Sequence, residues 1–269
     1  MGSSMAARGA RLRFHSDYRV EVEPVDIPVP GRNQVLLRVT QSQVSAGSEQ
    51  NFFRHNPPDG PAASANLGYM TVGRVEQVGE GVTAYAPGDR VLSCGFHGSH
   101  WLVELDDGGE PIDGKNYIQK VDEELTDAEI GFAVLGDVAL HGVRRAAPQI
   151  DESAVIFGCG IVGQLTIQLA RVAGCYPIIA IDLFDSRLEK ARISGATHLI
   201  NASTTDPVQA IRDITNGAGG EIVFHCTPIA AMLQTTLEAA AERGKVILTG
   251  SAPGTAEIGL QVELMRREP

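Results

Sequence analysis

Apolar and polar residues alternate in short runs through the first part of the chain, and Gly, Pro and Asp separate one run from the next. The runs at residues 18–25, 34–39 and 73–79 have the period of two that is typical of β-strands. Turn-forming residues at 28–31 and 87–89 interrupt them. Strands this short and this evenly spaced predict a barrel-like, mostly-β N-terminal domain.

Near Leu125 the pattern changes from the period of a strand to that of a helix. Thr126 and Glu129 have the spacing of a capping box, which marks the start of a helix. We predict that this helix continues to Arg145 and connects two domains. Its expected buried face consists of Ile130, Val134, Val138 and His141, with the histidine as a packing residue.

Residues 153–182 combine two buried strands with a helix between them. The apolar run at 154–157 predicts the first strand, and the run at 177–181 predicts the second. Gly174 is placed to end the intervening helix. The predicted buried residues of this helix are Val162, Leu165, Leu169, Val172 and Ala173.

Strands and helices continue to alternate along the rest of the chain. Ser186 with Glu189 predicts the start of a helix that Gly195 ends, and Asp206-Pro207 predicts the start of another that Gly217 ends. The remaining predicted elements are a strand at 221–226, an Ala-rich helix at 229–243 and a strand at 245–250.

An alternation of this kind forms a parallel, doubly wound sheet. The predicted fold class is therefore α/β, with a mostly-β, barrel-like N-terminal domain followed by a Rossmann domain. We place the N-terminal domain and its bridging helix at residues 5–148 and the Rossmann domain at 149–269.

Glycines follow the first Rossmann strand in the pattern G-x-G-x-x-G. The first permits a sharp turn, the second lets the backbone approach a pyrophosphate, and the third lets helix and strand pack closely. The helix N-terminus offers unpaired N–H groups to the anion, and Asp182 ends the second strand, where an acid accepts hydrogen bonds from an adenosine ribose. The expected cofactor-binding residues are Gly158, Gly160, Ile161, Val162, Gly163, Asp182, Arg187, Thr227 and Gly250.

The expected cofactor is NAD(H), with NADP(H) as the weaker candidate. Asp182 would repel a 2′-phosphate, and the next residues, Leu183 and Phe184, provide no cation to offset that repulsion. Arg187 leaves an alternative open, because its side chain could reach a phosphate or support the adenosine ribose beside the acid.

Composition narrows the class of partner. A net charge of −11 without a basic cluster argues against nucleic acid. No run of about 18 apolar residues is present, so we predict no membrane span. The four cysteines show no C-x-x-C spacing, which predicts reduced thiols and a cytoplasmic location. The expected partner is a small-molecule substrate.

The chain as a whole resembles the medium-chain dehydrogenase/reductase superfamily over nearly its full length. The resemblance implies a partly barrel-like catalytic domain, a Rossmann domain, and hydride transfer with a nicotinamide cofactor. The residues that carry it, besides the glycine motif, are Gly68-Tyr69, Gly73, Val75, Gly79 and Gly88-Asp89-Arg90-Val91.

Two segments differ from the zinc-dependent members of that superfamily. Those members carry a zinc-binding Cys in C-G-[ST]-D and a His in G-H-E, whereas this chain has Ala46-Gly47-Ser48-Glu49 and Gly68-Tyr69-Met70. Only Cys94 stands in the region of their structural zinc lobe. A catalytic zinc needs about three protein ligands. The differences therefore predict no metal site and imply a zinc-independent branch that includes a bacteriochlorophyllide-dehydrogenase-like group.

Ser48 and Tyr69 are the expected catalytic residues, because their counterparts in the superfamily face the substrate. Without zinc, hydrogen-bond donors must stabilise the negative charge on the substrate oxygen. We expect Tyr69 to donate and Ser48 to assist. An alternative is that Tyr69 only fills the volume of the missing zinc site. Glu49 is expected to brace the backbone of its own loop.

Three histidines are weaker candidates. His97 and His100 share one loop, and hydrogen bonding within that loop is favoured over metal binding, because no nearby Cys or acidic residue completes a ligand set. His225 is expected at the edge of the nicotinamide pocket, since ligands bind at the carboxyl ends of parallel strands.

These features predict a zinc-independent oxidoreductase that transfers a hydride between NAD(H) and a small alcohol, ketone or activated double bond. Two alternatives stay open: an NADPH-dependent quinone or enoyl reductase, and a non-catalytic dinucleotide-binding sensor or assembly protein. The chain stops at Pro269, where longer relatives enter a sixth Rossmann strand. Either this sequence is a fragment of a longer chain, or the cofactor domain is shortened and lacks that strand. In the second case we expect any homo-oligomer to form by another route.

Overall fold

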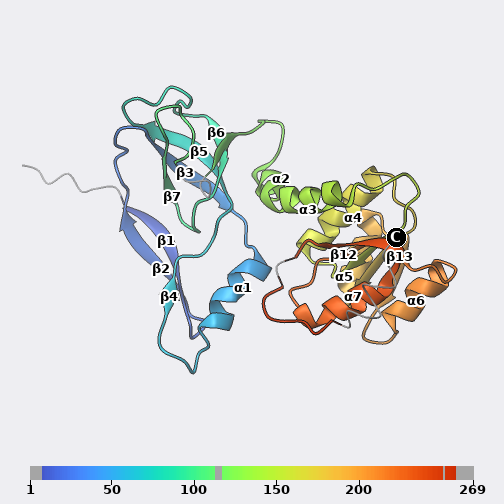
Figure 1. Ribbon diagram of the computed structural model, residues 1–269. Helices are drawn as coiled ribbons and strands as arrows, with labels where there is room; N and C mark the ends of the chain where they lie inside the picture. Colours follow the sequence, from blue (N-terminus) through green and yellow to red (C-terminus); the bar gives the residue numbers. More distant parts are fainter. Residues whose placement is uncertain (1–7, 113–116, 251, 259–269) are drawn as a thin grey trace, which may run out of the picture. The chain divides into compact units, whose positions relative to one another are not determined.

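The computed structural model describes residues 8–112, 117–250 and 252–258. Internal contacts divide the chain into two compact units, one up to Val134 and the other from Leu135 onward (Figure 1). The predicted domain bounds, 5–148 and 149–269, and the predicted absence of a sixth strand stay predictions.

The first unit is mostly β, as predicted. A five-stranded antiparallel sheet has the order β7-β3-β5-β6-β8, and a three-stranded sheet has the order β2-β1-β4. Alternate residues of the larger sheet, among them Val35, Leu37, Val75 and Val91, form its core. The elements are β1 Arg8–His15, β2 Val20–Asp26, β3 Gln34–Ser42, α1 Ala46–His55, β4 Ser64–Ala65, β5 Thr71–Val78, β6 Arg90–Ser93, β7 His100–Glu104, β8 Ile118–Lys120 and α2 Asp127–Gly131.

The second unit is a parallel five-stranded sheet with helices between its strands, and it confirms the predicted doubly wound architecture. The strand order is β11-β10-β9-β12-β13, so the chain reverses its direction of winding at β9. The elements are α3 Ala133–Ala146, β9 Ala154–Phe157, α4 Ile161–Val172, β10 Ile178–Asp182, α5 Asp185–Ser194, β11 His198–Asn201, α6 Pro207–Ile214, β12 Gly220–His225, η1 Ala230–Met232, α7 Leu233–Ala239 and β13 Ala240–Leu248.

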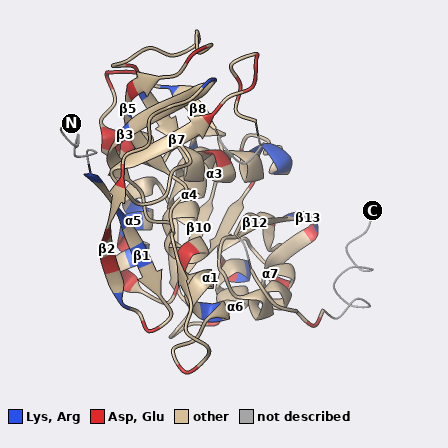
Figure 2. Cartoon of the chain, turned by 90° about the vertical axis from the view of Figure 1, so that its left-hand side faces the viewer, with Lys and Arg blue, Asp and Glu red and all other residues tan. Residues whose placement is uncertain are grey.

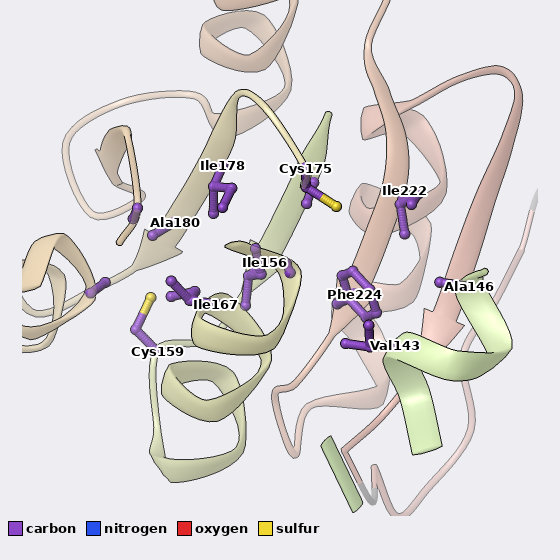
Figure 3. Close-up of a cluster of buried hydrophobic side chains, with 14 of the residues drawn as sticks. Val143, Ala146, Ile156, Cys159, Ile167, Cys175, Ile178, Ala180, Ile222 and Phe224 are labelled. Carbon is purple, nitrogen blue, oxygen red and sulfur yellow. The ribbon is translucent and has the colours of Figure 1, made fainter. Parts of the chain in front are cut away.

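Both faces of the parallel sheet are buried. Ile156 and Phe224 point to one face, where they pack with Val143 of α3 and Ile167 of α4 (Figure 3). Val155 and Phe157 of β9 belong, with Val223 of β12, to a second cluster on the other face. A strand buried on both faces has to be apolar throughout, which explains why the run at 154–157 was readable as a strand.

The predicted buried face of α4 is correct only in part. Leu169 and Ala173 pack against the core, but the fully buried side of the helix lies one residue further along. Gly163, Thr166, Ile167 and Ala170 are buried, whereas Val172 is 86% exposed. The cause is close packing at Gly163. A Cβ there would lie 1.9 Å from the carbonyl oxygen of Gly158, so the glycine has to face the sheet.

The predicted bridging helix is two helices, α2 and α3, separated at Phe132. The capping box of Thr126 and Glu129 is confirmed. The predicted face of α3 is wrong, because Val138 and His141 are exposed. Its buried residues are instead Leu135, Ala139, Gly142, Val143 and Ala146.

Two further boundaries differ from the prediction. Ser186 does not start α5, because the helix begins at Asp185 and its N-cap, Phe184, makes no side-chain cap bond. The predicted helix at 229–243 ends at Ala239, because Ala240 pairs with Gly220 and begins β13. Pairing in the sheet therefore overrides the helix propensity of the alanines.

Acidic and basic residues alternate along the described elements that this view shows (Figure 2). Within the same described residues, no helix is both long and apolar enough to span a membrane.

Candidate functional site

The glycine motif lies where the sheet reverses its winding, between the carboxyl ends of β9 and β12. Gly158 follows β9 with φ of +91°, and a Cβ on it would come within 2.8 Å of Cγ2 of Thr227, which follows β12. Gly250, after β13, lies against the backbone of Cys226, where a Cβ would be 3.0 Å from the carbonyl carbon. The structure thus brings together three of the predicted cofactor residues at one edge of the sheet, where α/β proteins bind ligands.

The N-terminus of α4 provides the expected anion cradle. Gly160 is the N-cap and makes no side-chain cap bond, and a Cβ built on it meets nothing within 4 Å. Ile161 and Val162 form the first turn, whose N–H groups have no partner within the helix. Open space beside unpaired N–H groups suits a pyrophosphate. These residues therefore fit a dinucleotide.

Asp182 ties the glycine loop to the end of β10. Its carboxylate is only 7% exposed. Oδ2 accepts a hydrogen bond from the backbone N–H of Cys159 at 2.8 Å, and Oδ1 accepts from those of Leu183 at 2.8 Å and Phe184 at 3.1 Å. Arg187 Nη1 lies 3.6 Å from Oδ2. The carboxylate is held in place by three backbone donors, and Oδ2, which accepts only one of them, keeps acceptor capacity for a ribose hydroxyl.

Cys159, inside the glycine motif, is 2% exposed. Burial, followed by the nearby charge of Asp182, raises the pKa of its thiol to about 12. The thiol is therefore protonated at neutral pH.

His225 ends β12 and is 1% exposed. Its Nδ1 is 3.0 Å from Oγ1 of Thr236, and its Nε2 is 3.2 Å from Oγ1 of Thr227. Burial lowers the pKa of the imidazole, so the neutral form is favoured. The ring therefore holds the side chain of Thr227 through a hydrogen bond. Thr236 was missed by sequence reasoning, because a threonine inside a helix carries no motif.

A second group of polar residues belongs to the first unit. Ser48, exposed in the first turn of α1, has its Oγ 3.3 Å from the hydroxyl of the half-buried Tyr69. Tyr69 donates its proton to Oγ of Ser45 at 2.6 Å. Both predicted catalytic residues therefore meet, and the structure adds Ser45, which sequence reasoning missed. A Ser before a helix was the available signal, but it pointed to a cap.

Glu49 and His97 form a buried pair behind these hydroxyls. Glu49 Oε1 accepts the backbone N–H of Ser45 at 2.7 Å, so the predicted brace within its own loop is present. Glu49 Oε2 is 3.0 Å from His97 Nε2, and His97 Nδ1 is 2.8 Å from Oγ of Ser42. His100 bonds instead to Ser99 and Glu76. The two histidines therefore have hydrogen-bonding roles with separate partners.

The residues at the superfamily's zinc positions do not fit a zinc ion. Ala46 has no donor atom, and Tyr69 is engaged by Ser45. Glu49 and His97 are nearby donors, but both carboxylate oxygens and both ring nitrogens already have hydrogen-bond partners. Over the part of the chain that the structure describes, no three His, Cys, Asp or Glu side chains group as a metal site.

Comparison with known families gives two matches along the chain. Residues 31–104 match the alcohol dehydrogenase GroES-like domain, and residues 162–268 match the zinc-binding dehydrogenase family. The chain belongs to the medium-chain dehydrogenase/reductase superfamily. The predicted class of enzyme, an NAD(P)-dependent oxidoreductase of that superfamily, is confirmed.

Individual members agree with this assignment. Sorbitol dehydrogenase of Bacillus subtilis is 26% identical over 272 residues, which cover 93% of this chain and 76% of that protein. L-threonine 3-dehydrogenase of Pyrococcus abyssi is 28% identical, with coverage of 93% and 77%. The structure of alcohol dehydrogenase TADH from Thermus sp. ATN1 has a TM-score of 0.80 at 26% identity and covers 96% of this chain and 82% of that one. The chain thus spans about three quarters of the length of the curated relatives.

Proposed function

We propose that this protein transfers a hydride between NAD(H) and a small alcohol or ketone, with an activated double bond as the second substrate class, and that it does so without zinc. The observation that carries the proposal is the hydroxyl pair of Ser48 and Tyr69. This pair occupies the two segments in which zinc-dependent members of the superfamily carry zinc ligands.

The chemistry needs a substitute for the metal. Hydride transfer to a carbonyl leaves negative charge on oxygen, and an oriented hydroxyl donor is worth about 3 to 4 kcal/mol in the barrier when it acts on such a charge. Ser48 and Tyr69 are hydroxyls that already contact each other, so one substrate oxygen can interact with both. Sorbitol, butanediol and threonine all carry a secondary alcohol, and relatives named for these compounds favour the alcohol–ketone pair.

The choice of NAD(H) rests on Asp182. A buried carboxylate that backbone amides hold in place accepts ribose hydroxyls and repels a 2′-phosphate. Arg187, 3.6 Å from the Asp182 carboxylate, favours NADP(H) and with it the quinone or enoyl reductase alternative. Tighter binding of NADPH than of NADH in a titration would overturn the assignment.

Turnover assays test the proposal. Protein treated with a chelator is mixed with NADH or NADPH and with ketones, enones or quinones, and in the reverse direction with NAD and secondary alcohols. We expect metal-free, NADH-dependent turnover of a ketone. Activity that requires added zinc would contradict the proposal, and the absence of turnover with every substrate class would favour the non-catalytic alternative.

Tyr69→Phe then tests the site. Loss of the hydroxyl should reduce kcat about a hundredfold while NADH affinity is nearly unchanged. Tyr176→Phe, at a tyrosine of the second unit that is 59% exposed, is the control and should keep full activity. Full activity of Tyr69→Phe would refute the catalytic assignment.

A further inference from the structure

Ser45 sits at the N-cap of α1 but does not cap the helix with its side chain. A serine at this position ordinarily accepts a hydrogen bond from the first turn of the helix. Here Oγ accepts the proton of Tyr69 instead, at 2.6 Å, and the residue is only 4% exposed. The hydroxyl of Ser45 therefore accepts a hydrogen bond from Tyr69 instead of capping the helix.

The backbone of Ser45 is held from two sides by one residue. Its N–H donates to Oε1 of Glu49 at 2.7 Å, and its carbonyl accepts the N–H of Glu49 at 2.9 Å. The other carboxylate oxygen lies 3.0 Å from the ring of His97, which Ser42 holds on its far side. Glu49 is 8% exposed and His97 is 3% exposed. A buried network with every member bonded fixes the position of Ser45.

The same histidine also fixes the segment that carries Tyr69. Its backbone N–H donates to the carbonyl of Leu67 at 2.8 Å. Gly68 has φ of +109°, and a Cβ on it would lie 2.8 Å from the nitrogen of His97. The chain just before Tyr69 therefore lies directly against His97. Ser45 and Tyr69 are thus located by one shared residue.

We propose that Ser45 is a positioning residue for the Tyr69 hydroxyl, and that the Glu49–His97 pair holds Ser45 in place. In the structure Tyr69 donates to Ser45. A serine hydroxyl both accepts and donates, so when Tyr69 turns its proton toward a substrate oxygen, Ser45 can donate in return and keep the phenolic oxygen in place. Any effect on turnover rests on the proposed function, whereas the hydrogen bond itself can be measured without it.

A double-mutant cycle separates positioning from folding. Ser45→Ala should lower kcat about tenfold, with NADH affinity unchanged, because the phenolic hydroxyl loses its orientation. Ser45→Thr keeps the hydroxyl and should restore most of the rate. When Tyr69 is already Phe, Ser45→Ala should change kcat less than twofold, since it has no hydroxyl left to orient. An equal loss in both backgrounds, or no loss in either, would overturn the proposal.

A spectroscopic measurement covers the case in which no substrate is found. The ¹³Cζ resonance of ring-labelled Tyr69, assigned by its loss in Tyr69→Phe, should shift in Ser45→Ala. The matched control is Ser16→Ala, which removes another buried serine hydroxyl of the first unit, one that accepts the N–H of Ala63 at 3.2 Å. It should lower stability but leave both the resonance and kcat unchanged. An unshifted resonance in Ser45→Ala would refute the positioning role of Ser45, whatever the enzyme's activity. If Tyr69→Phe loses turnover while Ser45→Ala keeps it, the positioning role fails and the proposed function stands.

Discussion

The proposed dinucleotide site, made of the glycine loop and Asp182, and the hydroxyl cluster, made of Ser45, Ser48 and Tyr69, are built from different kinds of contact. The proposed dinucleotide site is made of backbone: glycines let the loops approach, and amide donors hold Asp182. The cluster is made of side chains that contact one another across long sequence separations, such as Ser45 with Tyr69. In a site made of backbone, an added side-chain atom at one of the closely packed glycines displaces the chain. In a site made of side chains, one group can be removed while the fold is kept. Substitutions in the two regions should therefore fail in different ways.

The largest effect is expected at Gly163. In Gly163→Ala the new Cβ would lie 1.9 Å from the carbonyl oxygen of Gly158, so the glycine loop has to move. We expect a loss of about 3 kcal/mol of unfolding free energy and loss of NADH binding. Calorimetry and NADH fluorescence titration measure these.

Gly136→Ala is the control, because a Cβ at this helical position meets nothing within 4 Å. It should stabilise the protein by about 0.5 to 1 kcal/mol. If Gly163→Ala bound NADH normally, the close approach of α4 to the loop would not matter for the site.

Asp182→Asn should act on binding with little effect on the fold's architecture. An amide retains one acceptor, but its NH₂ group would meet a backbone N–H, which costs about 1 to 3 kcal/mol. We expect NADH affinity to fall tenfold or more and the preference over NADPH to shrink. The exposed Asp185→Asn should leave both affinities unchanged. Unaltered preference in Asp182→Asn would refute the role of this carboxylate.

His225 makes the second unit sensitive to mild acid. Its pKa is lowered by burial, so below the ordinary value of about 6.5 the unfolded chain takes up a proton that the folded ring resists. Its contribution is fully present above that pH and is lost as pH falls toward the folded pKa, with a slope of at most about 1.4 kcal/mol per pH unit. Urea unfolding between pH 7 and 5 should show this slope, and His225→Asn should remove it. A slope retained in the variant would assign the effect to another group.

The stability of the first unit should depend on a carboxyl group and should therefore change at lower pH than that of the second unit, and by a smaller amount. A hydrogen bond from Thr40 at 2.5 Å, followed by bonds from Arg90, lowers the pKa of Asp127. The stabilisation is present above the ordinary carboxyl pKa of about 3.9 and is lost as pH falls through the lower folded value. We expect the difference in unfolding free energy between the wild type and Asp127→Asn to be smaller at pH 3 than at pH 6. A difference that is the same at both pH values would contradict the assignment.

The glycine loop could be predicted from sequence because the residues that shape it lie close together in the chain. Gly158 and Asp182 are needed by one strand–helix–strand unit, and each contributes through backbone contacts that a linear motif records. The mostly-β first unit was equally readable, since alternation is set by burial on one face of a strand. What a motif does not record is which side of a helix turns inward.

The hydroxyl cluster shows where sequence reasoning stops. Ser48 and Tyr69 were found through resemblance to a family, whereas Ser45 and His97 acquire their roles only through contacts between distant segments. The face of α4 differs from the prediction for a related reason. The close packing expected at Gly163 brings that side of the helix against Gly158, which the spacing of the apolar residues alone does not indicate.

The reactivity of Cys159 reports on local opening of the glycine loop. A thiol reacts as the thiolate, and at neutral pH a buried thiol with a pKa of about 12 has almost none. Alkylating reagents can therefore modify this sulfur only from states in which the loop has come away from Asp182. The rate of alkylation of Cys159 therefore measures how often the glycine loop opens. Bound dinucleotide should lower this rate.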